Sequence, residues 1–255
     1  MMNSARLIVI FLFLGVLTGF AQEVNEIPTA GATGSIEEQK VATMEIVIRA
    51  ATPTLLINLV AALITYTLAI VTAFSVLYFG RWTRHVLTQV LNTLACVSPL
   101  ILLLIVYSAL SPRGLLLGVF LGIAIYPLIG RQLLARVTEA SGEFQFMQAK
   151  ILGHSPIGVF VFYALPKFIP LTMPFFFFGF IYSLIMESMF NSLGLLDLKS
   201  DDTWETWGAL IQLGADHLLD APWQVFYPGI AIIITTLVAS LLVPIFDRIL
   251  SVRKA

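Results

Sequence analysis

Charged residues are scarce in this chain. Asp, Glu, Lys and Arg make up 11% of its 255 residues, whereas a soluble domain carries about 25%. Hydrophobic residues make up 58%, and the mean hydropathy is +0.94. So few charges cannot cover the surface of a soluble protein, and the composition therefore predicts a membrane protein. The net charge of −1 argues against nucleic acid as a partner, because phosphate binding needs clustered Lys and Arg.

Cysteine and the common catalytic motifs are also missing. The single cysteine, Cys96, excludes an internal disulfide and a cysteine-based zinc site, and we expect it to be buried as a small hydrophobic side chain. His85, His154 and His217 lie far apart and form no His-Glu-x-x-His motif. No Gly-Lys pair occurs, which excludes a Gly-x-x-x-x-Gly-Lys-Ser/Thr phosphate loop. We therefore expect no catalytic residue, cofactor or metal site, and a membrane enzyme is disfavoured.

Long apolar runs dominate what is present. A membrane helix needs about 20 apolar residues. Candidate runs cover residues 6–21, 54–80, 86–110, 115–130, 168–187 and 226–246. The first is short and ends in Gly19-Phe20-Ala21, which resembles a cleavage site, so it is either a transmembrane helix or a signal peptide. The runs predict an all-α, polytopic membrane protein with about six transmembrane helices.

The predicted organisation has three parts. Residues 1–21 form the first transmembrane helix or the signal peptide. Residues 22–52 are polar and acidic and are expected to form an irregular extracytoplasmic connector. Residues 53–255 form the transmembrane domain, whose first helix is expected to start at Pro53, because proline fits the first turn of a helix. We expect Pro99 to kink a continuous span.

Basic residues predict the orientation. With six spans, ten of the 14 Lys and Arg residues fall on one side of the membrane and four on the other. The side richer in Lys and Arg is the cytoplasmic side. This places both termini in the cytoplasm, and it makes 81–85 a short basic cytoplasmic turn.

A polar interruption, residues 132–167, separates the predicted fourth and fifth spans. Ala149 and Gly153 lie four residues apart and share one face of a helix, where small side chains allow another surface to approach closely. An apolar stripe runs along the same segment through Phe144, Met147 and Ile151. Two interpretations follow from the residues alone: an amphipathic helix on the lipid surface, or a helix held by a cytoplasmic partner.

Spacing around this segment resembles a known family. Met147-Gln148-Ala149, three residues, Gly153, nine residues and Tyr163-Ala164-Leu165-Pro166 are similar to a loop of binding-protein-dependent ABC importer permeases. That loop reads Glu-Ala-Ala, three residues, Gly, nine residues, Ile-x-Leu-Pro, so the first Glu and the Ile are replaced here. Residues 187–195, 206–210, 221–223 and 227–232 also resemble the C-type permease of dipeptide, oligopeptide and nickel importers.

The resemblance implies a type I importer permease fold with a coupling helix between spans four and five. It also implies a sister permease as heterodimer partner, two cytoplasmic ATPase subunits and an extracytoplasmic solute-binding protein, which together import peptides or similar small solutes. The residues implied to contact the ATPase are Met147, Gln148, Ala149, Gly153, Leu165 and Pro166. The alternatives are a secondary transporter, which would need ionisable residues near the bilayer midplane, and a non-transporting membrane anchor.

Three further expectations concern the C-terminal half. Glu187 ends a predicted span and is a candidate for the transport pathway or its outer gate, although a snorkelling or turn-forming role is equally compatible with its position. Trp204, Trp207 and Trp223 are expected at the membrane–water boundary. The aromatic run 175–178 is expected to face lipid or to pack in the core.

Overall fold

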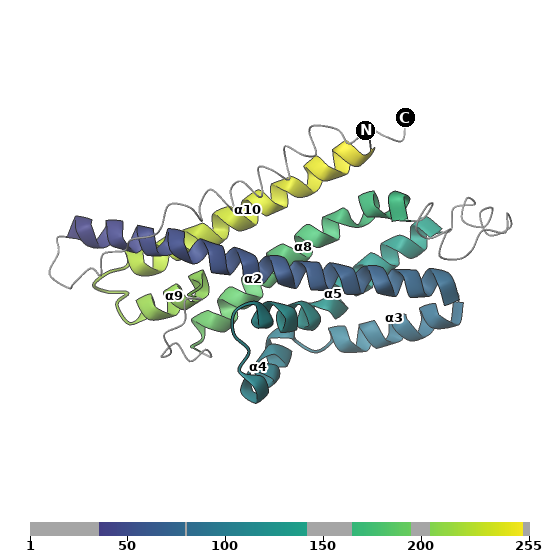
Figure 1. The fold of residues 1–255 in the computed structure, drawn as a ribbon, viewed down its shortest axis with the longest axis horizontal. Helices are drawn as coiled ribbons and strands as arrows, with labels where there is room; N and C mark the ends of the chain where they lie inside the picture. Colours follow the sequence, from purple (N-terminus) through teal and green to yellow (C-terminus); the bar gives the residue numbers. More distant parts are fainter. Residues whose placement is uncertain (1–35, 80, 142–164, 195–204, 252–255) are drawn as a thin grey trace. The chain divides into compact units, whose positions relative to one another are not determined.

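The computed structural model describes residues 36–79, 81–141, 165–194 and 205–251. Every regular element in this part of the chain is an α-helix (Figure 1), which confirms the all-α prediction. The helices are α2 (Ile36–Phe79), α3 (Arg81–Ala95), α4 (Pro99–Leu110), α5 (Leu115–Ser141), α8 (Leu165–Ser192), α9 (Trp207–Ala215) and α10 (Trp223–Ser251).

The described helices confirm a polytopic membrane fold. Four are long and apolar enough to cross a membrane, within Ile36–Val76, Leu115–Glu139, Leu171–Ser192 and Trp223–Pro244. The bent pair Trp82–Ala95 and Pro99–Leu110 meets the same criterion when its two helices are taken together. Each overlaps one predicted apolar run. The remaining predicted run, 6–21, lies outside the described residues.

The predicted start of the first described span is wrong. α2 begins at Ile36 and continues without a break for 44 residues, so it includes part of the segment that we expected to be irregular, and the predicted boundary at residue 52 falls inside it. Glu37 and Glu38 occupy the first turn of α2, where carboxylates interact favourably with the helix dipole. Lys40 also pairs with Glu37 at 3.5 Å. The charged residues led to the prediction of an irregular segment, whereas at these positions they stabilise the N-terminus of a helix.

Pro53 lies inside α2 instead of starting it. Proline removes one backbone donor from a helix, but such losses are tolerated in membrane helices where neighbouring groups compensate. Next to the proline, the Thr54 hydroxyl donates to the Ala50 carbonyl oxygen at 2.7 Å. Val47, Ala50 and Thr54 are all buried, so tertiary packing holds this stretch in the helix.

The predicted span 86–110 is two helices rather than one kinked helix. α3 and α4 differ in direction by 78°, and Pro99 starts α4 after the extended residue Ser98 (φ −62°, ψ 127°). A residue before proline disfavours the helical conformation, which explains the break. The expected basic turn, 81–85, is the first turn of α3. Cys96 lies in the break and is exposed in the described chain, which contradicts its predicted burial.

α5 continues beyond the predicted end of its span. It reaches Ser141, so the first ten residues of the polar interruption are helical. Leu133, Leu134 and Val137 are buried, and their spacing keeps one apolar stripe facing the core. The prediction ended this helix too early because it relied on polarity. The buried apolar stripe of α5 continues past Gly130 among charged residues.

The described chain divides into two compact units, which are considered separately: unit 1 comprises 1–57 and 187–234, and unit 2 comprises 58–186 and 235–255. In unit 2, α5 approaches α2 closely at Gly122, where an added Cβ would lie 2.6 Å from the Ala61 carbonyl oxygen. The Thr65 hydroxyl donates to the Gly122 carbonyl oxygen at 2.9 Å. Small residues at such crossings are typical of membrane helices.

α8 packs on the same half of α2 in unit 2. Tyr66 and Thr172 share a hydrogen bond of 2.9 Å between their hydroxyl groups, and Ser183 donates to the Asn58 carbonyl oxygen at 3.3 Å. In the aromatic run 175–178, Phe175 and Phe177 are buried, as expected for side chains of the core, whereas Phe178 is exposed.

Candidate functional site

The predicted coupling residues are only partly described by the structure. Met147, Gln148, Ala149 and Gly153 lie outside the described residues. Leu165-Pro166 forms the start of α8, where proline is compatible with a first helical turn. In chain order, the coupling segment therefore connects α5 to α8.

A buried polar cluster in unit 1 is the described candidate site. It comprises Thr54 of α2, Glu187 and Asn191 of α8, Thr206, and Trp207 of α9. The side chain of Glu187 is 1% exposed, and the four other residues are buried as well. Polar groups buried in a membrane protein need internal partners. Hydrogen bonds supply them to most of this cluster, whereas Asn191 Oδ1 has no partner in the described part of the chain.

Asn191 is the centre of the cluster. Its Nδ2 amide donates to the Oε1 carboxylate oxygen of Glu187, four residues earlier on the same face of α8. The same Nδ2 amide donates to the hydroxyl oxygen of Thr206 at 2.7 Å. One amide group thus connects the end of α8 with the residue before α9.

Trp207 connects α9 to α2 through two donors. Its backbone N–H donates to the Thr54 hydroxyl oxygen at 3.0 Å, and its indole Nε1–H donates to the Val47 carbonyl oxygen at 2.8 Å. Trp207 is 4% exposed, so these two hydrogen bonds hold a side chain that is buried inside unit 1, and its position at the membrane–water boundary stays a prediction. Trp204 lies outside the described residues. Trp223 is partly buried, with the Lys40 ammonium 5.7 Å from its ring centroid.

Gly208 allows α9 to contact α8 directly. A Cβ at this position would lie 2.7 Å from the Ser188 Cα, 2.9 Å from the Ser188 carbonyl oxygen and 2.9 Å from the Asn191 Cβ. These neighbours are backbone or near-backbone atoms, so they cannot move aside. The absence of a side chain at Gly208 thus sets the contact that brings Thr206 within reach of Asn191.

The geometry bears on the alternatives for Glu187. A snorkelling carboxylate keeps its charged end in water, which does not fit a side chain buried within the chain and bonded to Asn191. Two groups of residues that the sequence comparison selected separately, 187–195 and 206–210, meet here. The role of Thr54 was not predicted. The sequence offered one indication of this role, because Thr54 is a hydroxyl residue directly after Pro53 at the start of an apolar run.

The cluster resembles a positioning device more than a catalytic site. Its side chains are a carboxylate, an amide, two hydroxyls and an indole, which include no nucleophile–base pair of the kind that activates hydrolysis. Among the described residues, no group of three His, Cys, Asp or Glu side chains is placed to hold a metal ion. What the hydrogen bonds accomplish is to hold α2, α8 and α9 together within unit 1.

Comparisons with known proteins agree with this architecture. The dipeptide transport system permease protein DppC of Alkalihalophilus pseudofirmus is 25% identical over 162 residues, which cover 63% of this chain and 52% of that protein. A putative peptide transport system permease protein of Brucella suis is 24% identical over 186 residues, covering 73% of this chain and 62% of the relative. The chain thus spans about half to three-fifths of the length of these relatives.

A family match covers most of the chain. Residues 65–255 match the family described as the inner membrane component of binding-protein-dependent transport systems. The matched region includes the second part of α2, all later helices and the segment between α5 and α8. The chain therefore belongs to the family of binding-protein-dependent transport system inner membrane components.

Proposed function

We propose that this protein is the permease subunit of an ABC importer and forms part of the pathway by which peptides or similar small solutes cross the bacterial inner membrane. The observation that carries the proposal is the family match over 65–255, because it includes the spans as well as the segment with Gly153 and Leu165-Pro166. The names of the relatives, which are dipeptide and peptide transport permeases, support peptides as the solute.

The proposed partners follow from what the chain lacks and from its family. It contains no phosphate loop, so ATP hydrolysis must occur in other subunits, for which we propose two cytoplasmic ATPases. A sister permease completes the pathway, and an extracytoplasmic binding protein delivers the solute. A role without enzymatic activity agrees with membership of a transport family.

In the proposed mechanism, the segment between α5 and α8 couples ATPase closure to movement of the spans. Met147, Gln148, Ala149 and Gly153 form the contact with the ATPase, and Leu165-Pro166 starts the span that receives the motion. Closure of the ATPases around ATP favours one of two conformations of the permease, so binding at one site shifts an equilibrium at another.

Glu187 contributes to the outer gate in this proposal. Its carboxylate is held by Asn191, which also binds Thr206. Because the same cluster binds α9 to α8, displacement of α8 is transmitted to α9. The support for this role is the burial and bonding of Glu187 inside the described chain, which fit a positioning residue.

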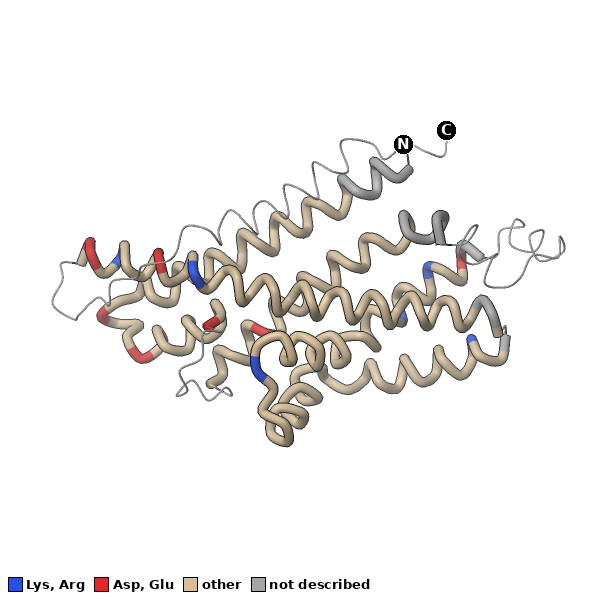
Figure 2. The backbone as a smooth tube through the Cα atoms, in the orientation of Figure 1, with Lys and Arg blue, Asp and Glu red and all other residues tan. Residues whose placement is uncertain are grey.

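The proposed orientation places the α5–α8 segment in the cytoplasm. Figure 2 shows basic positions near the start of α3 and in the second half of α5, at one end of these helices, and another basic position at the opposite end of α5, before its first turn. In the sequence, Arg84 lies near the start of α3, Arg131 and Arg136 lie in the second half of α5, and Arg113 precedes α5 by two residues. An excess of Lys and Arg marks the cytoplasmic side.

Transport by the purified assembly tests the proposed function. The tagged chain, extracted with its bound subunits and reconstituted into vesicles with its binding protein, is expected to import labelled peptide only when ATP is present on the ATPase side. An ionophore that dissipates ion gradients should leave the rate unchanged. Uptake that needs no ATP and stops with the ionophore would instead establish the secondary transporter, and an assembly without an ATPase subunit would contradict the proposal.

A further inference from the structure

A pocket of about 700 Å³ with a mixed polar and apolar lining lies in unit 2 between α3 and α5. α3 lines it with Arg84, His85, Thr88 and Asn92, and α5 contributes Arg131. Both arginines are exposed. Its described lining residues include no Asp or Glu, so this part of the chain gives the pocket two fixed positive charges and no negative one.

The inner end of the pocket is closed by hydrophobic packing. Leu91 and Leu134 line the pocket and form a buried cluster with Val76. Charged and polar groups therefore surround an opening above an apolar floor. A ligand with a compact anionic group and an adjoining apolar part fits this distribution.

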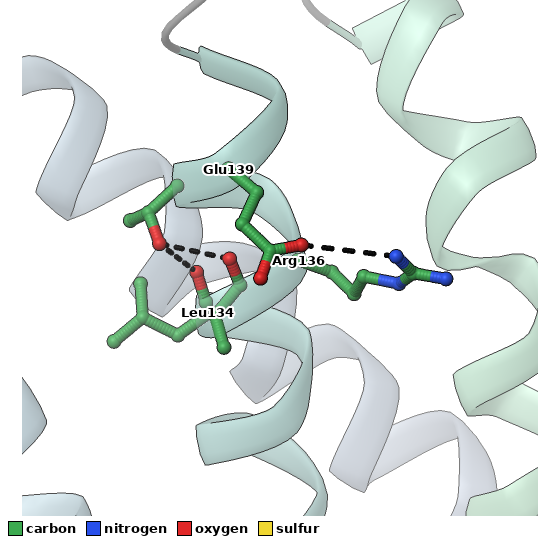
Figure 3. Close-up of polar contacts among 5 residues, drawn as sticks. Leu134, Arg136 and Glu139 are labelled. Atoms are coloured by element: carbon green, nitrogen blue, oxygen red, sulfur yellow. Dashed lines mark hydrogen bonds and ion pairs between the residues drawn. The ribbon is translucent and has the colours of Figure 1, made fainter.

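Neighbouring charges on α5 do not neutralise the two arginines. Glu139 pairs with Arg136, with 3.7 Å between Oε2 and the guanidinium nitrogen Nη1 (Figure 3). Within the described part of the chain, Arg84 and Arg131 have no ion pair with a carboxylate. Among the described carboxylates, none therefore competes with a ligand for these two arginines.

Another lining residue, Thr138, is already engaged. Its hydroxyl donates to the carbonyl oxygens of Leu134 at 3.0 Å and Ala135 at 2.9 Å, as drawn in Figure 3. It therefore contributes shape rather than a donor. The other described lining residues whose side chains can donate hydrogen bonds are Arg84, Arg131, His85, Thr88 and Asn92.

The outer face of α3 indicates the depth of the pocket in the membrane. Trp82, Val86, Val90 and Leu94 follow one another at intervals of four residues and are all exposed, with Trp82 at 82%. They form an apolar stripe that acyl chains can cover. Tryptophan is enriched at headgroup level, so Trp82 places the first turn of α3, including Arg84, at that level.

We propose that this pocket binds the phosphate headgroup of an anionic phospholipid from the cytoplasmic leaflet. Arg84 and Arg131 contact the phosphate from two different helices, and the apolar stripe of α3 lies alongside the acyl chains. Arginine is suited to phosphate because its planar group offers paired donors. The lipid would connect α3 to α5 next to the start of the coupling segment. The proposal does not depend on which solute the protein transports.

Native mass spectrometry of the full chain in detergent tests the proposal with phosphatidylglycerol and phosphatidylcholine of equal chain length. We expect phosphatidylglycerol to bind about tenfold more tightly, because each basic residue near a membrane surface contributes measurably to anionic lipid binding. Arg84→Gln combined with Arg131→Gln should remove this preference. Arg49→Gln, which removes one positive charge at an exposed position of α2 outside the pocket, should retain it.

Three outcomes would overturn the proposal. One is an undiminished preference for phosphatidylglycerol in the double Gln variant. Another is displacement of phosphatidylglycerol by excess inorganic phosphate, which would assign the pocket to a free anion. The third would come from the double variant Arg84→Lys with Arg131→Lys. This variant keeps both positive charges, so we expect it to keep most of the preference for phosphatidylglycerol. If the Lys variant loses the preference and also unfolds earlier in phosphatidylcholine, the arginines serve packing only.

Discussion

Gly153→Glu is expected to leave the protein inserted in the membrane while peptide uptake falls to background. In the proposed coupling helix, Gly153 shares a face with Ala149, where small side chains let the ATPase surface approach the backbone. A Glu side chain there adds bulk and brings an unpaired charge into the contact. Leaving a buried charge without a partner costs several kcal/mol, and about 1.4 kcal/mol already changes an equilibrium tenfold.

Uptake of labelled peptide and the amount of protein in the membrane fraction are to be measured together. Gly153→Ala is the matched control, because it adds one methyl group without charge and should retain most of the uptake. Normal transport by the Glu variant would show that this face of the helix makes no tight contact. Absence of the Glu variant from the membrane fraction would contradict the expectation that this position lies outside the folded spans.

Gly208→Leu is expected to separate α9 from α8 and to destabilise unit 1. An added Cβ would meet Ser188 Cα at 2.7 Å and Asn191 Cβ at 2.9 Å, so the helix must shift before the side chain fits. Overpacking of this kind costs about 1–3 kcal/mol. The shift also weakens the hydrogen bond from Asn191 to Thr206, which contributes about 1 kcal/mol. For a chain of this length, these losses lower the unfolding temperature by roughly 5–10 °C.

Gly229→Leu is the matched control for this experiment. An added Cβ at Gly229 of α10 has no heavy atom within 4 Å among its counted neighbours, so the same substitution meets open space in the described chain. Thermal unfolding of both purified variants in detergent provides the comparison. An unfolding temperature for Gly208→Leu as high as that of Gly229→Leu would contradict the close contact between α8 and α9.

The existence of the membrane helices was predictable, but their boundaries were not. Length and apolarity dominate the insertion of a span, so every described span overlaps a predicted run. Boundaries depend on context. Pro53 continues α2 because tertiary packing surrounds it, whereas Pro99 starts α4 after an extended residue. The first part of α2, before residue 50, and the last part of α5, after Gly130, were not predicted to be helical. Both segments are polar, and only a narrow face of each is buried.

The candidate site was predictable only in part. Glu187 was selected because an ionisable residue at the end of a span is unusual, but its hydrogen bond with Asn191 was not predicted. The contributions of Trp207 and Thr54 depend on a hydrogen bond between residues 153 positions apart, which no local pattern reveals. Trp207 was selected because tryptophans usually gather at the membrane–water boundary, and that reasoning did not reveal its two hydrogen bonds to α2.

Photo-cross-linking from residue 148 tests the central proposal most directly. A photoreactive amino acid replaces Gln148 in cells that are importing peptide, and the adducts are identified by mass spectrometry. The proposed coupling mechanism predicts a covalent adduct with an ATPase subunit that carries a phosphate loop. Adducts with lipid alone, or with the extracytoplasmic binding protein, would contradict it.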